Sequence, residues 1–139
     1  MRWVDWYGDS SLHVLDVALA CCSLEFDAAA PPTAGPAVEP PVGGRTAVVV
    51  SGTVTDRLAP AVAAVVGSLR ARQDVAPVVV AYGVCATTGG PYWDSYAVTK
   101  GVDALVPVDV YVPGCPPTPA ALREVLDGLA GRAGHRATA

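Results

Sequence analysis

The sequence predicts an α/β domain built on a parallel sheet, and three observations support this fold class. From Thr46 onward, short runs of β-branched residues alternate with segments of helical periodicity, which implies parallel strands joined by right-handed crossovers. The length of 139 residues suits one domain with its own core. Turns rich in glycine and proline follow two of the expected strands, at the edge where such sheets bind ligands.

The expected elements follow the chain in order. Asp9 and two serines offer N-cap oxygens, and apolar residues then recur at helical spacing, so an N-terminal helix is expected at about 11–21. Residues 28–44 hold five prolines and three glycines and are expected to form a linker without periodic structure. Strands are expected at 46–50, 78–82 and 106–112, and helices at 60–72 and 119–129.

Charge and hydropathy exclude several functions. The net charge is −4 and no basic run exceeds two residues, so the basic surface needed for nucleic-acid binding is absent. No apolar run reaches the roughly 18 to 20 residues of a membrane span, and the N-terminus lacks a secretory signal. Only 16% of the residues are charged. We therefore expect a cytosolic chain whose surface is partly covered by partners.

Four cysteines stand at turns or at the end of the expected first helix: Cys21, Cys22, Cys85 and Cys115. In a reducing cytosol such cysteines are more often ligands than disulfides. Cys85 and Cys115 each follow an expected strand, which places them at one edge of the sheet. Adjacent Cys21 and Cys22 can both reach one centre only if the backbone bends there. Four thiolates arranged in this way are a ligand set for one [4Fe–4S] cluster.

Other interpretations of the cysteines are less consistent with the pattern. Structural zinc sites usually pair cysteines two to four residues apart, and no such pair is present. A disulfide between the adjacent cysteines would be strained. Core cysteines usually stand singly in periodic apolar segments. The chain also has no G-x-G-x-x-G loop, so it is not expected to bind NADH or FMN itself.

Four segments in order resemble one known family: residues 19–25 with the tandem cysteine, 51–60, 82–90 and 106–118. They are similar to the B subunit of respiratory complex I, the NADH–quinone oxidoreductase, which is related to the small subunit of nickel–iron hydrogenases. The resemblance implies a flavodoxin-like three-layer α/β fold with a short parallel sheet and an N-terminal helix. It also implies that Cys21, Cys22, Cys85 and Cys115 bind the [4Fe–4S] cluster that passes electrons to quinone.

The resemblance further implies a multisubunit setting. The expected partners are other complex I subunits, above all a large hydrogenase-like catalytic subunit and a ferredoxin-like subunit, with quinone bound at the interface. The chain would then lie peripherally on the cytoplasmic side of the cell membrane, in a proton-translocating enzyme, and would be inactive alone. Glu25 and Arg57 match family positions and are expected near the quinone or the cluster. A solvated glutamate and a surface salt bridge are the simpler alternatives for these two residues.

Two other functions remain open at this stage. The chain could serve a hydrogenase-like or ferredoxin-fed membrane complex, or bind a cluster without enzymatic activity. Between Asp27 and Gly44 it departs from the family pattern, because alanine, proline and glycine replace a longer, basic segment that helps form the family's quinone pocket. We therefore expect electrons to reach the cluster while quinone reduction is weak.

The expected organisation is one domain with four segments. These are the N-terminal helix with the tandem cysteine (1–27), the linker (28–44), the α/β cluster-binding segment (45–131) and a tail (132–139).

Overall fold

The computed structural model describes residues 1–132, which form a three-layer α/β fold around a six-stranded sheet of order β3-β1-β2-β4-β5-β6. The strands β2, β4, β5 and β6 run parallel, and β1 is antiparallel to β2 and β3. The strands are β1 (Arg2–Asp5), β2 (His13–Ala18), β3 (Gly35–Pro36), β4 (Thr46–Ser51), β5 (Val78–Tyr82) and β6 (Val110–Val112). The helices are α1 (Cys22–Ala29), α2 (Ala59–Arg72), α3 (Val84–Thr88) and α4 (Pro119–Leu129), with 3₁₀ turns η1 (Gly90–Tyr92) and η2 (Val102–Ala104).

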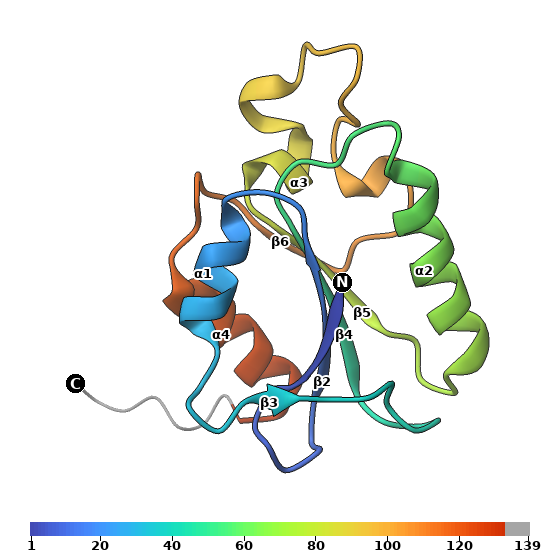
Figure 1. Cartoon of the computed structure of the whole chain (residues 1–139), viewed down its shortest axis with the longest axis vertical. Coiled ribbons are helices and arrows are strands. Elements are labelled where there is room, and N and C mark those ends of the chain that lie inside the picture. Colours follow the sequence, from blue (N-terminus) through green and yellow to red (C-terminus); the bar gives the residue numbers. More distant parts are fainter. Residues whose placement is uncertain (133–139) are drawn as a thin grey trace.

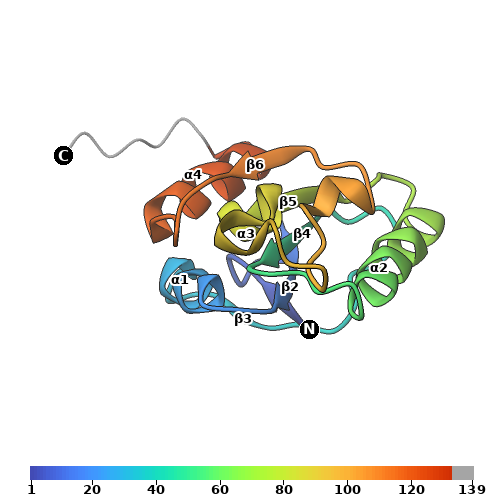
Figure 2. The same ribbon diagram turned by 90° about the horizontal axis from the view of Figure 1, so that it is seen from above.

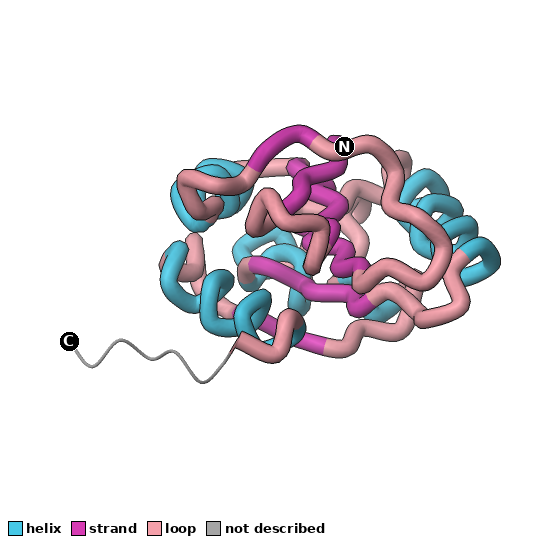
Figure 3. The backbone as a smooth tube through the Cα atoms, turned by 90° about the horizontal axis from the view of Figure 1, so that it is seen from below, coloured by secondary structure: helices cyan, strands magenta, loops and turns pink. Residues whose placement is uncertain are grey.

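Helices cover both faces of the sheet. Figures 1 and 2 show α1 and α4 on one side and α2 on the other, and the view from below gives the same arrangement (Figure 3). The α1/α4 side holds Trp6 edge-on to Phe26, with ring centroids 5.5 Å apart, together with the apolar stripe of α4. The α2 side packs Val62, Val66 and Leu69 against β4 and β5. The fold class predicted from the sequence is therefore confirmed.

The N-terminal helix expected at 11–21 is wrong. Residues His13–Ala18 form β2, which pairs in parallel with β4, and the helix begins only at Cys22. The cause is burial on both faces: five consecutive residues of β2, from His13 to Val17, are buried. Such a strand carries no alternation of apolar and polar residues, so periodicity cannot separate it from a short buried helix.

The expected linker is docked on the sheet. Its first residues belong to α1, and β3 pairs with β1 through Val4↔Pro36 and Asp5↔Gly35. Ala37 N donates to the carbonyl of Trp3 at 3.1 Å, and the carboxylate of Glu39 lies 2.6 Å from the guanidinium of Arg72. Backbone pairing with a free strand edge needs no apolar periodicity, and an edge strand tolerates proline.

The remaining elements match the expected ones closely, with one shorter strand. The strands at 46–51 and 78–82 and the helices at 59–72 and 119–129 lie where the sequence placed them. Of the strand expected at 106–112, only β6 is extended in the sheet. Asp109 ends the preceding loop, because its backbone N–H donates to Val79 O at 2.9 Å and its carboxylate accepts from Val79 N at 2.8 Å.

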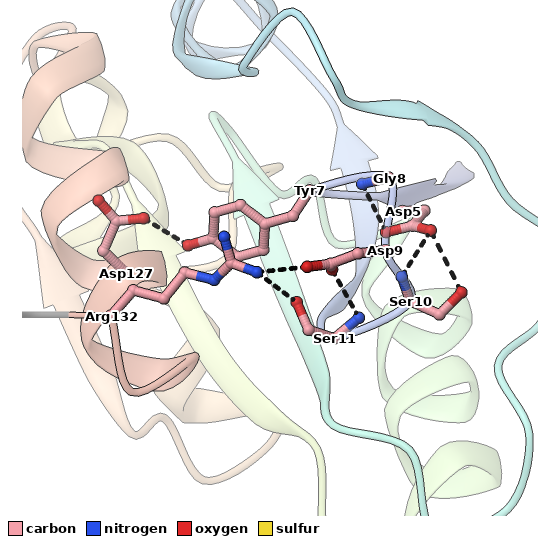
Figure 4. Close-up of polar contacts among 8 residues, drawn as sticks. All are labelled: Asp5, Tyr7, Gly8, Asp9, Ser10, Ser11, Asp127 and Arg132. Carbon is pink, nitrogen blue, oxygen red and sulfur yellow. Dashed lines mark hydrogen bonds and ion pairs between the residues drawn. The ribbon is translucent and has the colours of Figure 1, made fainter.

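The C-terminal end of α4 is tied to the connection between β1 and β2. Tyr7 donates its hydroxyl hydrogen to Asp127, and Arg132 donates to Asp9 while its guanidinium lies 3.8 Å from the centre of the Tyr7 ring (Figure 4). Arg132 belongs to the expected tail, and the rest of that tail lies outside the described residues. Within residues 1–132 no helix has the length and apolar character to cross a membrane.

Candidate metal centre

The four cysteines follow the carboxyl ends of three parallel strands. Cys21 and Cys22 come after β2, Cys85 after β5 and Cys115 after β6. These ends share one edge of the sheet, the upper one in Figure 1, where the start of α1, the short helix α3 and the turn after β6 are seen. The structure thus places every predicted cysteine at the ligand-binding edge of an α/β sheet.

The cysteines divide into two buried and two exposed thiols. The side chains of Cys22 and Cys85 are 3% and 9% exposed, whereas Cys21 and Cys115 are exposed, and all four are free. The two buried thiols would contact a bound ligand from the protein side, and the two exposed thiols would contact it from the solvent side.

Glycines bring the backbone against the two buried sulfurs. A Cβ added at Gly83, where φ is +99°, would lie 2.5 Å from Cys22 Sγ. One added at Gly90 would lie 3.0 Å from Cys85 Sγ. A side chain at either position would occupy the space that the thiols need, so both glycines are required by close approach as well as by backbone conformation.

Backbone hydrogen bonds join the segment of Cys85 to that of Cys115. Gly83 N donates to Val112 O at 2.8 Å, and Val84 N donates to Gly114 O at 2.9 Å. Gly83 also precedes α3, and left-handed Gly89 ends that helix after Thr88. Sequence analysis missed α3, since a helix of five residues is too short to show a period; the flanking glycines were the available signal.

Burial disfavours ionisation of the inner thiol. Desolvation, with the nearby Cys21, Cys85 and Glu25, raises the pKa of Cys22 to about 12. Burial and the charges of Cys22 and Glu25 likewise raise the pKa of Tyr82 to about 12. Cys22 would therefore stay protonated at neutral pH without a cation, and a positively charged metal is the partner that converts such a thiol to a thiolate.

The two further residues expected near the site differ in position. Glu25 is half-buried in the first turn of α1 and acts electrostatically on both Cys22 and Tyr82, so the structure brings it to the cysteines. Arg57 is exposed in the turn between β4 and α2, at the same edge of the sheet. Sequence analysis did not single out Tyr82 or Gly83, although both lie in one of the family-like segments.

The described part of the chain holds no ready-made site for a single ion. Across residues 1–132, no three or more His, Cys, Asp or Glu side chains are arranged to hold one metal ion. A four-iron cluster makes a different demand, because each thiolate binds a different iron at a corner of a cube and the sulfurs stay farther apart. Four free thiols at one sheet edge fit such a group in the chemistry of their donor atoms.

Cysteine thiolates at the carboxyl edge of an α/β sheet are a donor set that iron–sulfur clusters use in redox proteins. The profile of the 20 kDa subunit of NADH ubiquinone oxidoreductase matches residues 10–129, and the chain belongs to this family.

Curated relatives are similar over most of the chain. The chain is 48% identical over 133 residues to one of the NADH-quinone oxidoreductase B subunits of Streptomyces griseus subsp. griseus, covering 86% of this chain and 52% of the relative. It is 46% identical over 133 residues to an NADH-quinone oxidoreductase B subunit of Salinispora tropica, covering 86% of this chain and 64% of the relative. The chain thus spans about half to two thirds of the length of these curated proteins.

A solved structure shares the fold. A chain of the membrane-bound sulfane sulfur reductase, an archaeal respiratory membrane complex, superposes with a TM-score of 0.67 at 24% identity, covering 95% of this chain and 76% of that one. At this level of identity the similarity supports the three-layer fold alone.

Proposed function

We propose that this chain is the electron-transfer subunit of a complex I type NADH–quinone oxidoreductase and binds one [4Fe–4S] cluster through Cys21, Cys22, Cys85 and Cys115. The observation that carries the proposal is the convergence of these cysteines on one edge of the sheet from three segments of the chain. Family membership supports it independently. When bound, the cluster would accept and release one electron at a time.

The chain's own residues would hold and enclose the cluster. Cys22 and Cys85 would bind it from the buried side, and Cys21 and Cys115 from the exposed side. Gly83 and Gly90 leave room for the sulfurs of Cys22 and Cys85 and bring backbone close to them. Backbone N–H groups near cluster sulfurs are one means by which a protein sets the reduction potential.

The exposed surface near the cysteines supports association with other subunits. Leu24, Trp93 and Tyr96 are apolar or aromatic and exposed, in α1 and in the loop after η1. Aromatic residues are enriched in the cores of protein interfaces. We propose that this edge faces a large hydrogenase-like subunit, that a ferredoxin-like subunit supplies electrons, and that quinone binds at the interface near Glu25 and Arg57. The chain would then be peripheral, on the cytoplasmic side of the membrane.

The direct test is anaerobic reconstitution of the full chain. We expect about four irons per chain and an electron paramagnetic resonance signal on reduction, as ligation by four thiolates requires. Cys85→Ser and Cys115→Ser should each lose most of the iron, while Gly67→Ala, a change on the exposed side of α2, should lose none. Stoichiometric zinc with no uptake of iron would refute the proposal.

The place in the complex needs a separate experiment. The chain would replace the B subunit of a working complex I, and one would measure NADH-driven reduction of its cluster and, separately, quinone turnover. We expect the cluster to be reduced while quinone turnover is weak, because the segment 28–44 pairs with β1 and α2 instead of providing a basic lobe. Normal turnover would show that this segment does not limit quinone chemistry.

A further inference from the structure

Tyr82 is the last residue of β5 and is completely buried, with 0% of its surface exposed. Its ring packs in the core on the α1/α4 side, with Cys22, Phe26 and Leu122 in the same cluster. Its hydroxyl group donates toward two backbone carbonyls, Pro117 O at 3.1 Å and Thr118 O at 3.2 Å. The ring of Tyr82 is thus buried among apolar residues, while its hydroxyl group hydrogen bonds to the backbone at residues 117 and 118.

That piece of backbone follows the turn of Cys115. Pro117 is two residues after the cysteine, and Thr118 is the N-cap of α4. The hydroxyl of Tyr82 therefore fixes the segment after Cys115 to the end of β5. The backbone hydrogen bond from Val84 N to Gly114 O, 2.9 Å long, fixes the segment just before Cys115 to the same strand end.

Tyr82 also lies next to the segments of Cys22 and Cys85. Gly83, the next residue, lies against the sulfur of Cys22, where an added Cβ would be 2.5 Å away. Cys85 follows three residues after Tyr82. Tyr82 and its neighbour Gly83 thus contact or adjoin all three segments that carry the cysteines.

We propose that Tyr82 is a positioning residue for the cluster: its hydroxyl hydrogen bonds to Pro117 O and Thr118 O fix the Cys115 turn relative to Cys22 and Cys85. The inference rests on the proposed function, because it assigns Tyr82 a role in the cluster site. Without these bonds the turn of Cys115 would be held on one side only, and the exposed thiolate would be the first to leave its iron.

Tyr82→Phe isolates the hydroxyl group, because it keeps the ring in the core and removes the donor. The change leaves Pro117 O without the hydroxyl donor, whereas Thr118 O still accepts from Ala121 N. We expect an effect of about tenfold, which corresponds to about 1.4 kcal/mol. The matched control is Tyr7→Phe, which also removes one tyrosine hydrogen bond, to Asp127. Tyr7 comes before β2 in the chain, whereas Cys21 and Cys22 follow the opposite end of that strand.

Three measurements on the full chain test the proposal. They are hydrogen exchange of the backbone amides of the non-proline residues in 114–121 of the iron-free chain, the rate at which the reconstituted chain loses iron to a chelator, and the resonance spectrum of the reduced cluster. For Tyr82→Phe we expect faster exchange confined to 114–121, about tenfold faster iron loss and an altered spectrum. For Tyr7→Phe we expect iron loss and a spectrum like those of the original chain.

A rescue experiment separates the hydrogen bond from general damage to the core. Replacement of Tyr82 by 4-aminophenylalanine restores an N–H donor at the same place on the ring, and all three measurements should return toward the original values. Failure of this rescue would overturn the inference, as would a Tyr82→Phe chain with unchanged exchange, iron loss and spectrum.

The outcomes also distinguish this inference from the proposed function. If the original chain takes up no iron, the proposed function fails and Tyr82 has no cluster to position. If the original chain binds iron normally and Tyr82→Phe behaves in the same way, only the role of Tyr82 is lost.

Discussion

Gly83→Ala should strongly destabilise the fold, and its cost can be worked out from two features of the structure. Gly83 has φ +99° and ψ 156°, a backbone conformation that costs a residue with a side chain about 1–3 kcal/mol. The new Cβ would lie 2.5 Å from the sulfur of buried Cys22, and overpacking of this kind costs about 1–3 kcal/mol more. The expected loss of about 2–6 kcal/mol is a large share of the roughly 5–15 kcal/mol that stabilises a domain.

Urea unfolding of the iron-free chain, followed by fluorescence, measures this loss, since Trp6 is fully buried and should report the transition. Gly67→Ala is the matched control. Gly67 is exposed in α2 and an added Cβ there meets nothing within 4 Å. Alanine in a helix interior is favoured over glycine by about 0.5–1 kcal/mol. The same chemical change should therefore have opposite signs at the two positions.

A double-mutant cycle with Cys22→Ala isolates the contact with the sulfur. Removing Sγ relieves the overlap but leaves the backbone strain, so the two changes should be non-additive by about 1–3 kcal/mol. A Gly83→Ala chain as stable as the original, or additive effects in the cycle, would show that the turn after β5 does not pack on Cys22 as described.

Three further predictions concern charge and capping. Burial raises the pKa of Asp16 above its ordinary 3.8 despite the hydrogen bond from Arg2. The folded chain therefore binds a proton at this carboxylate more tightly than the unfolded chain does. The free energy of unfolding should consequently fall as the pH rises above 3.8. Asp16→Asn should flatten that fall in urea titrations over the acid range, and an unchanged slope would refute the assignment. Arg123 donates to Ala29 O at 2.9 Å, so Arg123→Ala should speed amide exchange in α1, whereas unchanged exchange would count against this link. Thr118 Oγ1 accepts from Ala121 N at 3.3 Å; Thr118→Ala should cost about 1 kcal/mol of unfolding free energy and Thr118→Ser much less, and equal costs would exclude the cap.

Much of the fold after residue 45 follows from local sequence. β4 and β5 are runs of β-branched residues flanked by turn residues, and α4 combines a Thr118 cap, a proline at its first position and an apolar stripe. These signals agree with the tertiary structure, so the predicted bounds are nearly the observed ones. The position of Cys85 and Cys115 at one edge then followed from the parallel topology alone.

Non-local contacts account for what the sequence could not predict. β3 exists because β1 presents a free edge, and its two residues carry no strand pattern of their own. The hydroxyl contacts of Tyr82 join residues 35 and 36 positions apart in the chain. Neither feature leaves a periodic trace, so only the assembled structure reveals them.

The correction at the N-terminus bears directly on how adjacent cysteines can share one ligand. In a strand, Cys21 and Cys22 would point to opposite faces. In the structure β2 ends at Ala18, Cys21 has helical angles (φ −55°, ψ −32°), and α1 begins at Cys22. Successive residues of an α-helix are rotated by about 100°, because one turn takes 3.6 residues. Cys22 is therefore buried and Cys21 exposed while both lie at the start of one helix, on the side of the sheet that Tyr82 occupies. The bend that ligation of one cluster by both cysteines would require lies where a strand passes into a helix, at the same sheet edge as Cys85 and Cys115.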